Sequence, residues 1–243
     1  MSVVPTSAHP EPERRRSTAM LAALLAFVLG GLTVALLYHF DVLESSSNPA
    51  DQGSGVQATQ ARDVAPFESV ELAGSNNVVV RVGVKQSVVV KADDNLLDRV
   101  TTDVQAGTLV IANTPGSFTT KSPMSVEVGV PALDALTLSG SGNIVLTGVD
   151  AGSLEVALPG SGTLTGSGAA TRLGVTVDGS GMVQLTQLVA QEVRAAVGGS
   201  GSVFVTATGS LDASVSGSGA IIYAGGPQEV ARSVTGSGAI TGG

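Results

Sequence analysis

The stretch Leu138-Ser-Gly-Ser-Gly-Asn-Ile-Val-Leu146 contains a Gly-Ser-Gly core that recurs along the 243-residue chain. Its six copies are spaced 20, 19, 20, 18 and 19 residues apart and begin at Gly140, Gly160, Gly179, Gly199, Gly217 and Gly236. Self-similarity at such a period is typical of a solenoid, in which each repeat forms one turn of a stack. A propeller blade needs about 40 residues, and the asparagine ladder and helical half of leucine-rich repeats are missing. The period therefore predicts a β-helix.

Apolar residues alternate with other residues on both sides of each Gly-Ser-Gly. The position two before the first Gly holds Leu138, Leu158, Val177, Val197, Val215 and Val234, and the position two after the last Gly holds Ile144, Leu164, Val183, Val203, Ile221 and Ile240. Alternation with period two is typical of strands with one buried face. Each repeat is thus predicted to be two short strands flanking a turn, and stacking the repeats buries one continuous inner column.

The Gly-Ser-Gly copies are predicted to be a structural ladder of turns. A coil that turns within two or three residues needs positive φ values or no Cβ, and glycine supplies both. The serine hydroxyls can bond neighbouring coils or nearby backbone. An anion-binding nest of backbone N–H groups is the functional alternative, but six unchanged copies favour the structural role. The members are Gly140, Ser141, Gly142, Gly160, Ser161, Gly162, Gly179, Ser180, Gly181, Gly199, Ser200, Gly201, Gly217, Ser218, Gly219, Gly236, Ser237 and Gly238.

The N-terminal part predicts a membrane anchor. Residues 1–16 form a polar, proline-bearing tail that is predicted to be disordered and cytoplasmic, and residues 17–40 contain no Asp, Glu, Lys or Arg. As a helix, these 24 residues span ~36 Å, enough to cross a ~30 Å hydrocarbon core. The arginines at 14–16 place the N-terminus in the cytoplasm and the C-terminal domain outside, in a single-pass cell-membrane protein. A cleaved signal peptide is the alternative, but its apolar core is normally shorter and ends at a small-x-small site.

The remaining chain divides by composition. Residues 41–63, rich in Ser, Gln, Asp, Ala and Gly, are predicted to be a flexible stalk. Residues 64–243 are predicted to be one all-β extracytoplasmic domain, a parallel β-helix, with an irregular section over 64–130 and regular coils of about 19–20 residues over 131–243.

Several ordered landmarks carry a resemblance to a known family. They are Pro66-Phe-Glu-Ser-Val, Asp94-Asn-Leu-Leu97, Val130-Pro-Ala-Leu133, the serial Ser-Gly-Ser-Gly copies and Tyr223-Ala-Gly-Gly-Pro227. Over residues 64–241 the chain resembles the bacterial "putative auto-transporter adhesin, head GIN domain" family. The resemblance implies a right-handed β-helix domain at the cell surface or in the periplasm, and it supplies no catalytic residues.

The residue inventory excludes several chemistries. The chain has no cysteine, and its two histidines, His9 and His39, precede the domain, so a Ser-His-Asp triad, a disulfide or a zinc site of the usual ligands is not expected there. After Phe40 there are 9 Lys and Arg against 18 Asp and Glu, which argues against nucleic acid as a partner. We expect no cofactor and no metal.

Asp93, Asp94 and Asp98 form the one dense acidic cluster. It could bind Ca²⁺ or supply the acid and base of a polysaccharide-acting enzyme. We favour a solvated turn with helix-capping aspartates. Carboxylates in the coils fall singly; they are Asp150, Glu155, Asp178, Glu192, Asp212 and Glu229.

Two residues are candidate contacts. Phe204, three positions after the last Gly of its copy, has outward parity, whereas Tyr223, four after, has inward parity. Arg232 occupies a column that holds Leu, Val or Ala in every earlier copy, so its coil should be frayed, capped or against a partner. An uncapped last coil presents an open β-edge, which predicts a homo-oligomer through the coil ends or a short edge that stays solvated.

The sequence thus favours a non-enzymatic adhesin or envelope interaction scaffold, anchored in the lipid bilayer through residues 17–40, with an unidentified surface ligand. The alternatives are a self-assembling structural protein and a polysaccharide-acting enzyme.

Overall fold

The structure, a computed structural model, describes residues 51–243. The predicted tail at 1–16 and the predicted transmembrane segment at 17–40 lie outside these residues and stay predictions. Between residues 51 and 243, no helix has the length and apolarity needed to cross a bilayer. One short 3-10 helix, η1 (Asp94–Arg99), accompanies the strands of the described part, so the all-β prediction is confirmed there.

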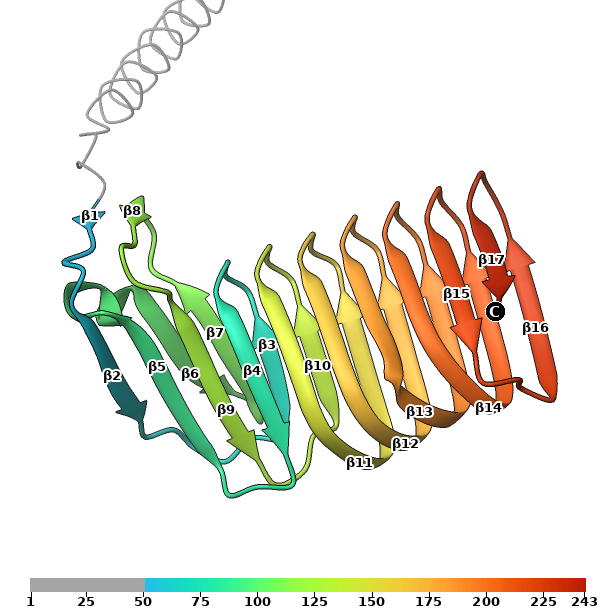
Figure 1. Ribbon diagram of the computed structural model, residues 1–243, viewed down its shortest axis with the longest axis horizontal. Coiled ribbons are helices and arrows are strands. Elements are labelled where there is room, and N and C mark those ends of the chain that lie inside the picture. Colours follow the sequence, from blue (N-terminus) through green and yellow to red (C-terminus); the bar gives the residue numbers. More distant parts are fainter. Residues whose placement is uncertain (1–50) are drawn as a thin grey trace, which may run out of the picture. The chain divides into compact units, whose positions relative to one another are not determined.

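Four long strands and four short ones build the C-terminal coils. They pair in parallel from coil to coil (Figure 1) and are β10 (Ala135–Leu138), β11 (Asn143–Leu158), β12 (Thr163–Val177), β13 (Met182–Val197), β14 (Ser202–Val215), β15 (Ala220–Ala224), β16 (Glu229–Val234) and β17 (Ala239–Gly242). Each of β11 to β14 runs from one Gly-Ser-Gly turn to the next. The sequence predicted two short strands flanking each turn, but in β11 to β14 the strand after one turn continues into the strand before the next. Each of these continuous strands bends at the edge opposite the turns.

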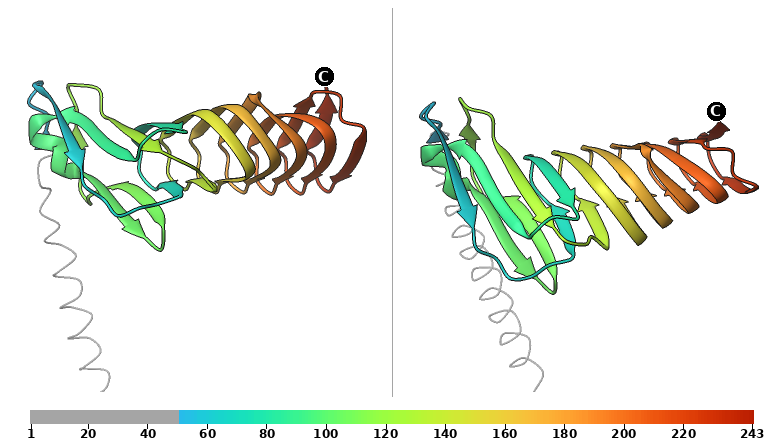
Figure 2. Two further views of the ribbon diagram at one scale, coloured as in Figure 1. Left: turned by 90° about the horizontal axis from the view of Figure 1, so that it is seen from below. Right: turned by 60° about the horizontal axis from the view of Figure 1, so that its bottom comes forward.

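The bend divides the solenoid into two sheets. The first sheet contains the first halves of β11 to β14, together with β15 and β17. The second sheet contains β10, the second halves of β11 to β14, and β16. Figure 2 shows the successive coils stacked as similar bent loops. The β-solenoid prediction is therefore confirmed.

The inner columns fill the space between the two sheets. Leu136, Val156, Val175, Ala195 and Ala213 follow one another in register and are all buried. Their side chains come from alternate positions of each strand, because successive side chains in a strand point to opposite faces. The interior of the solenoid is thus a packed apolar core without room for a ligand.

The missing side chain, rather than a positive φ, explains most of the turn glycines. A Cβ built on Gly179 would lie 1.8 Å from the carbonyl oxygen of Gly160, and one on Gly162 would lie 2.0 Å from that of Gly142. Among the twelve glycines of the six copies, only Gly236 has a φ in the positive range that disfavours side chains, at 115°. Each turn therefore packs directly on the backbone of the turn before it.

Backbone amides connect the turns, and the serine side chains of the ladder are exposed. The Ser161 amide donates to the Gly140 carbonyl at 3.1 Å, and the Ser200 amide donates to that of Gly179 at 3.2 Å. These amides are already used between coils, so the arrangement favours the structural role over an anion-binding nest.

The first coil in the sequence is not the first coil in space. β3 (Ser69–Leu72) pairs with both β10 and β7 (Thr108–Asn113), while β4 (Asn77–Val82) pairs with both β11 and β9 (Ser125–Val130). The coil of β3 and β4 therefore lies between the strands of 108–130 and those of 135–149. Its turn, Gly74-Ser-Asn76, is an additional copy that the Gly-Ser-Gly pattern does not include, because asparagine replaces the last glycine.

Antiparallel strands close the N-terminal end. β5 (Ser87–Asp93) pairs antiparallel with β9 and with β2 (Gln57–Arg62), and β6 (Val100–Gln105) pairs antiparallel with β7. β1 (Asp51–Gln52) pairs with β8 (Phe118–Thr119). The stalk predicted for residues 41–63 is therefore wrong over 51–62, because this segment contains β1 and β2, which pair with other strands of the domain.

Candidate functional site

Two columns of outward side chains run side by side across the second sheet. One column lies seven positions before the first Gly of each copy and contains Ser153, Arg172, Glu192, Ser210 and Glu229. The other lies five positions before that Gly and contains Glu155, Gly174, Arg194, Asp212 and Ala231. Six of these ten residues carry a charge, and strand pairing brings them together from five successive coils.

The two columns line an open groove of about 630 Å³, which we call the second-sheet groove. Gly174 forms part of its floor. A Cβ on Gly174 would lie 1.9 Å from Oε2 of Glu155, so the Glu155 carboxylate rests in the space that a side chain would otherwise fill. The absence of a side chain at Gly174 therefore gives the Glu155 carboxylate its place on the floor of the groove.

Carboxylates outnumber guanidinium groups in the groove by four to two. Arg194 pairs with Asp212, its Nη2 lying 3.1 Å from Oδ2, but both side chains are largely exposed. Exposed ion pairs contribute little to stability, typically below about 1 kcal/mol, so these groups are better suited to contacting a ligand than to holding the fold. The groove can donate and accept hydrogen bonds along its length, with an excess of negative charge.

In the sequence these carboxylates fall singly along the coils. The successive intervals between Glu155, Glu192, Asp212 and Glu229 are 37, 20 and 17 residues, yet the solenoid brings the four residues into one groove. The signal that could have found them is their offset from the glycines, because equal offsets become neighbours once coils stack in register.

The predicted acidic cluster serves the N-terminal end of the domain. Asp93 is buried, and its carboxylate accepts hydrogen bonds from the backbone amides of Gly55 at 2.9 Å, Lys121 at 2.8 Å and Ser122 at 3.3 Å. Burial raises the pKa of the Asp93 carboxyl, but these bonds and one from the Ser122 hydroxyl outweigh burial and hold the pKa below its ordinary value. A carboxylate so occupied is a poor general acid or base.

The other two aspartates differ from Asp93. Asp94 and Asp98 are exposed, as expected for a solvated turn. Asp93 was expected to be solvated as well, but it is buried. Asp94 accepts hydrogen bonds from the Ser54 hydroxyl and the Asn95 amide. Ser54 lies in the Gly53-Ser-Gly55 segment, so its hydrogen bond to Asp94 connects this segment to η1. Within residues 51–243, no group of three or more His, Cys, Asp or Glu is arranged to hold a metal ion.

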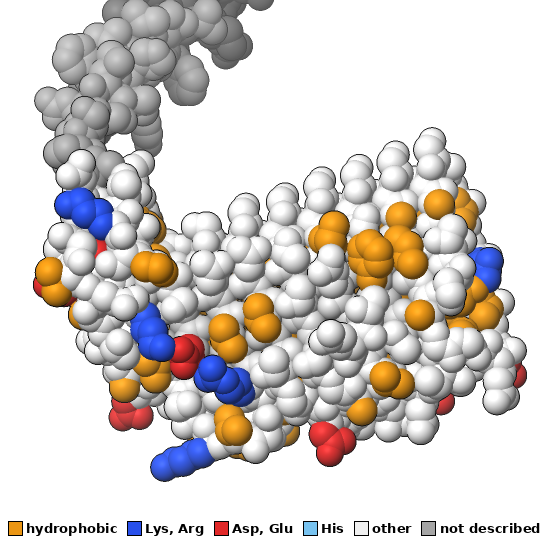
Figure 3. Space-filling model, in the orientation of Figure 1, with side chains coloured by type: hydrophobic (Ala, Val, Ile, Leu, Met, Phe, Trp, Pro, Cys, Tyr) orange, Lys and Arg blue, Asp and Glu red, His pale blue; other side chains and the backbone are white. Residues whose placement is uncertain are grey.

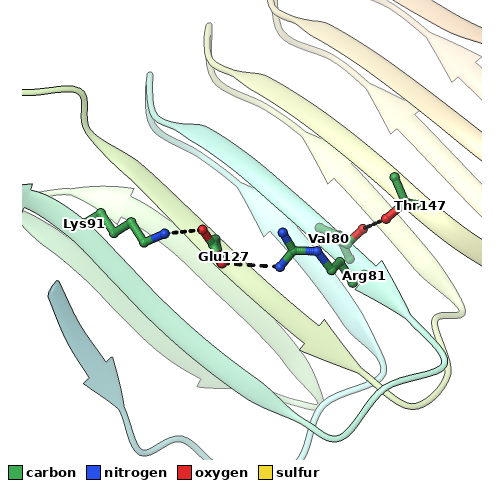
Figure 4. A network of polar contacts seen from close by, with 5 residues as sticks. All are labelled: Val80, Arg81, Lys91, Glu127 and Thr147. Atoms are coloured by element: carbon green, nitrogen blue, oxygen red, sulfur yellow. Dashed lines mark hydrogen bonds and ion pairs between the residues drawn. The ribbon is translucent and has the colours of Figure 1, made fainter.

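An ion-pair network marks the N-terminal part of the first sheet (Figure 4). Glu127 on β9 contacts Lys91 on β5 and Arg81 on β4, the latter at 3.3 Å. The hydrogen bonds from Lys91 and then Arg81 hold the pKa of the Glu127 carboxyl below its ordinary value. Thr147 on β11 lies just beyond the network, and its hydroxyl donates to the Val80 carbonyl at 3.4 Å.

Beyond this network the outward residues at 143–147 of β11, and those at the positions paired with them in β12, β13, β14, β15 and β17, carry no charge. We call the surface that these residues form the first-sheet face. Its central column is Val145, Thr165, Gln184, Phe204, Ile222 and Thr241. In Figure 3 the face shows white and orange side chains, whereas blue and red ones gather near the N-terminal section and along the edges. Phe204 points outward, as its parity predicted, and is half-buried among its neighbours.

The C-terminal end of the solenoid is open among the described residues. All six residues of β16 are exposed, including Val230 and Val234 from inner columns. Arg232 is exposed as well, and its guanidinium lies 5.0 Å from the centre of the Tyr223 ring and donates to the Tyr223 hydroxyl. The predicted cost of burying Arg232 is avoided, because the guanidinium extends across the open end and covers the buried Tyr223.

Comparisons with known proteins agree with this architecture. A putative adhesin from Bacteroides fragilis NCTC 9343 has a similar structure, with 23% identity, a TM-score of 0.65, and coverage of 79% of this chain and 99% of that chain. A putative adhesin from Parabacteroides distasonis ATCC 8503 aligns with 20% identity and a TM-score of 0.55, over 80% of this chain and 100% of that chain. At such identities the likeness shows the fold alone. None of the curated proteins matches the chain.

The family assignment comes from the sequence model that matches residues 66–227. This range spans the irregular N-terminal section, the additional turn at Gly74 and all but the last coil of the solenoid. The chain belongs to the family described as "putative auto-transporter adhesin, head GIN domain".

Proposed function

We propose that the domain is a non-enzymatic, adhesin-like binding module at the cell surface and that the second-sheet groove is its ligand-binding surface. The observation that carries this proposal is the alignment of six charged side chains from successive coils along one groove. The inner columns are filled by apolar side chains, so a ligand can be contacted only from outside. A rigid sheet supports the groove, which limits the entropy that binding would cost.

The groove chemistry favours a polymer that carries hydroxyl and amino groups, such as an amino-sugar polysaccharide. Carboxylate and guanidinium groups form strong hydrogen bonds with hydroxyl groups. The excess of two carboxylates attracts protonated amines and repels polyanions. The coils stack at ~4.8 Å, so an extended chain running along the solenoid meets new side chains at every coil.

A binding measurement with the full chain in lipid nanodiscs tests this proposal. The probe is a deacetylated glucosamine oligosaccharide, compared with its N-acetylated form and with a sulfated oligosaccharide of equal length. We expect the deacetylated probe to bind most tightly. The double variant Glu155→Gln/Glu192→Gln should weaken its binding by about tenfold or more, because two charge-assisted contacts are lost.

The matched control is Asp150→Asn/Asp178→Asn, which makes the same change in net charge on residues that do not line the groove. If this control weakens binding as much as the groove variant, only the overall charge matters and the groove is not the site. Equal binding of the sulfated probe would also contradict the proposal.

We also propose that residues 17–40 anchor the chain with the domain outside the membrane. The support is the sequence: 24 residues without a charge follow three arginines. Because the chain has no cysteine, single-cysteine variants can be labelled in whole cells. A membrane-impermeant maleimide should label Ser161→Cys in an exposed turn and leave Ser7→Cys in the tail unlabelled until the cells are lysed. The reverse pattern would refute this orientation.

Self-assembly through the coil ends is a second candidate function. The exposed β16, with Val230 and Val234, favours it at the C-terminal end. The antiparallel strands β2, β5 and β6 close the other end of the domain, which disfavours a head-to-tail fibre. The expected assembly is therefore a dimer in which the C-terminal ends of two copies pair with each other. Cross-linking through Ser233→Cys on β16 tests this contact.

A further inference from the structure

We infer that the first-sheet face pairs with the same face of a second copy, giving a two-fold symmetric dimer. This goes beyond ligand binding, because it concerns the opposite surface of the solenoid. A symmetric contact requires a surface that is complementary to itself. The charge, the composition and the area of the first-sheet face meet this requirement.

Charge points to this face first. The chain carries a formal net charge of −8, so two copies repel each other through most of their surfaces. None of the outward residues of the first-sheet face is charged, and Asp150 lies further along β11, after the register shift between Leu146 and Val149. The network of Arg81, Lys91 and Glu127 lies at its N-terminal boundary rather than within it. A second copy can therefore approach here without burying a charge.

The composition of the face suits a contact between proteins. Val145 is 44% exposed and Met182 36% exposed, and the half-buried Phe204 and Ile222 lie next to each other on β14 and β15. Aromatic residues and Met are enriched in interfaces, and charged residues are depleted from their centres. Thr165 and Gln184 lie between Val145 and Phe204 and can hydrogen-bond across a two-fold axis, because hydroxyl and amide groups both donate and accept.

The area that a dimer would bury favours the first-sheet face over the C-terminal end of the solenoid. Six coils at ~4.8 Å and about five residues at ~3.3 Å cover roughly 480 Å² in projection, or about 960 Å² for two copies before side-chain relief is counted. This approaches the ~1,000 Å² expected of a biological interface. The end of the solenoid, ~10 Å between sheets and ~20 Å along them, offers only about 400 Å² for two copies, within the range of incidental contacts.

Cysteine cross-linking of the full chain in its membrane tests the inference. We would place single cysteines on the first-sheet face at Thr165→Cys and Gln184→Cys, on the second sheet at Thr176→Cys, and on the open end at Ser233→Cys. Thr176 lies on β12, as does Thr165, but points to the opposite surface. With a short bismaleimide, we expect at least one first-sheet position to form dimers about tenfold more than Thr176→Cys. Labelling by a monofunctional maleimide corrects for accessibility.

A charge variant provides the second arm. In the Thr165→Cys background, Gln184→Glu places like charges across the interface and should lower dimer formation about tenfold, while Thr176→Glu should leave it unchanged. Cross-linking confined to Ser233→Cys would overturn the inference in favour of end pairing. So would equal cross-linking at Thr165→Cys and Thr176→Cys, or the absence of dimers at both first-sheet positions. Binding of the glucosamine probe in the second-sheet groove should be unaffected by Gln184→Glu, which separates this inference from the proposed function.

Discussion

The two outer surfaces of the solenoid share one set of coils but differ in chemistry. On the second sheet, charged side chains at equal offsets from the glycines line an open groove, and Gly174 leaves room in it for the Glu155 carboxylate. On the first sheet, the same coils present threonine, glutamine, serine and a few apolar side chains, without charge. Both surfaces rest on the same inner columns. The outward residues of the two faces of a solenoid can therefore vary independently, because the inward residues determine how the coils stack.

Substituting a turn glycine should disrupt both surfaces and cause the largest loss in the free energy of unfolding. In Gly179→Ala the new Cβ would lie 1.8 Å from the Gly160 carbonyl oxygen, so neighbouring coils must separate. We expect the free energy of unfolding to fall by about 3 kcal/mol or more, as for severe overpacking. Chemical denaturation followed by circular dichroism measures it. The control Ser180→Ala, in the same turn, should change it by less than about 0.5 kcal/mol because Ser180 is exposed. Similar losses in both variants would contradict the close-packing explanation.

Removing a core side chain beneath the groove should have the next largest effect. Leu173, on the inner side of β12 between Arg172 and Gly174, is 2% exposed. Leu173→Ala should lower the free energy of unfolding by about 2–5 kcal/mol, because it leaves a cavity. Val145→Ala, on the first-sheet face, should cost less than about 1 kcal/mol, since Val145 is 44% exposed. Thermal or chemical denaturation of the two variants measures both losses. Equal losses would contradict the distinction between inner residues, which hold the fold, and outward residues, which do not.

Filling the groove should alter one surface and spare the other. Gly174→Val would place a side chain where the flexible end of Glu155 now rests. We expect stability to change by less than about 1 kcal/mol, because valine favours strands, and binding of the glucosamine probe to weaken about tenfold, or about 1.4 kcal/mol. Thr176→Val, two residues further along β12, is the control that should leave binding unchanged. Unaltered binding of the glucosamine probe to Gly174→Val would show that the second-sheet groove is not its binding site.

The smallest effect is expected at the boundary of the first-sheet face. Glu127→Gln removes two partly exposed ion pairs and should cost about 0.5–1 kcal/mol at neutral pH and low salt. Because the folded-state pKa of Glu127 is lowered, its contribution is present above the ordinary value of about 4.3 and is lost as pH falls through the folded-state pKa. Denaturation midpoints from pH 7 to pH 2 should therefore converge for the two proteins. A difference that persists at pH 2 would assign the effect to packing.

The regular coils could be predicted from the sequence because each depends on local spacing. The interval between glycines and the alternation around them determined the repeat length, the inner columns and the outward direction of Phe204. A period-two pattern assigns every residue of a strand to one face or the other. Even the unusual Arg232 was identifiable as the residue that breaks its column.

Other features depended on the tertiary structure, because they require contacts between segments that are distant in the chain. The insertion of the β3–β4 coil between strands of 108–130 and 135–149 is a matter of pairing partners, which alternation does not specify. The inclusion of residues 51–62 in the domain depends on the pairing of β2 with β5 and on Asp93, whose buried carboxylate accepts hydrogen bonds from the amides of Gly55 and Lys121. The groove arose in the same way. Its charges are separate along the chain and become neighbours only when the coils stack in register.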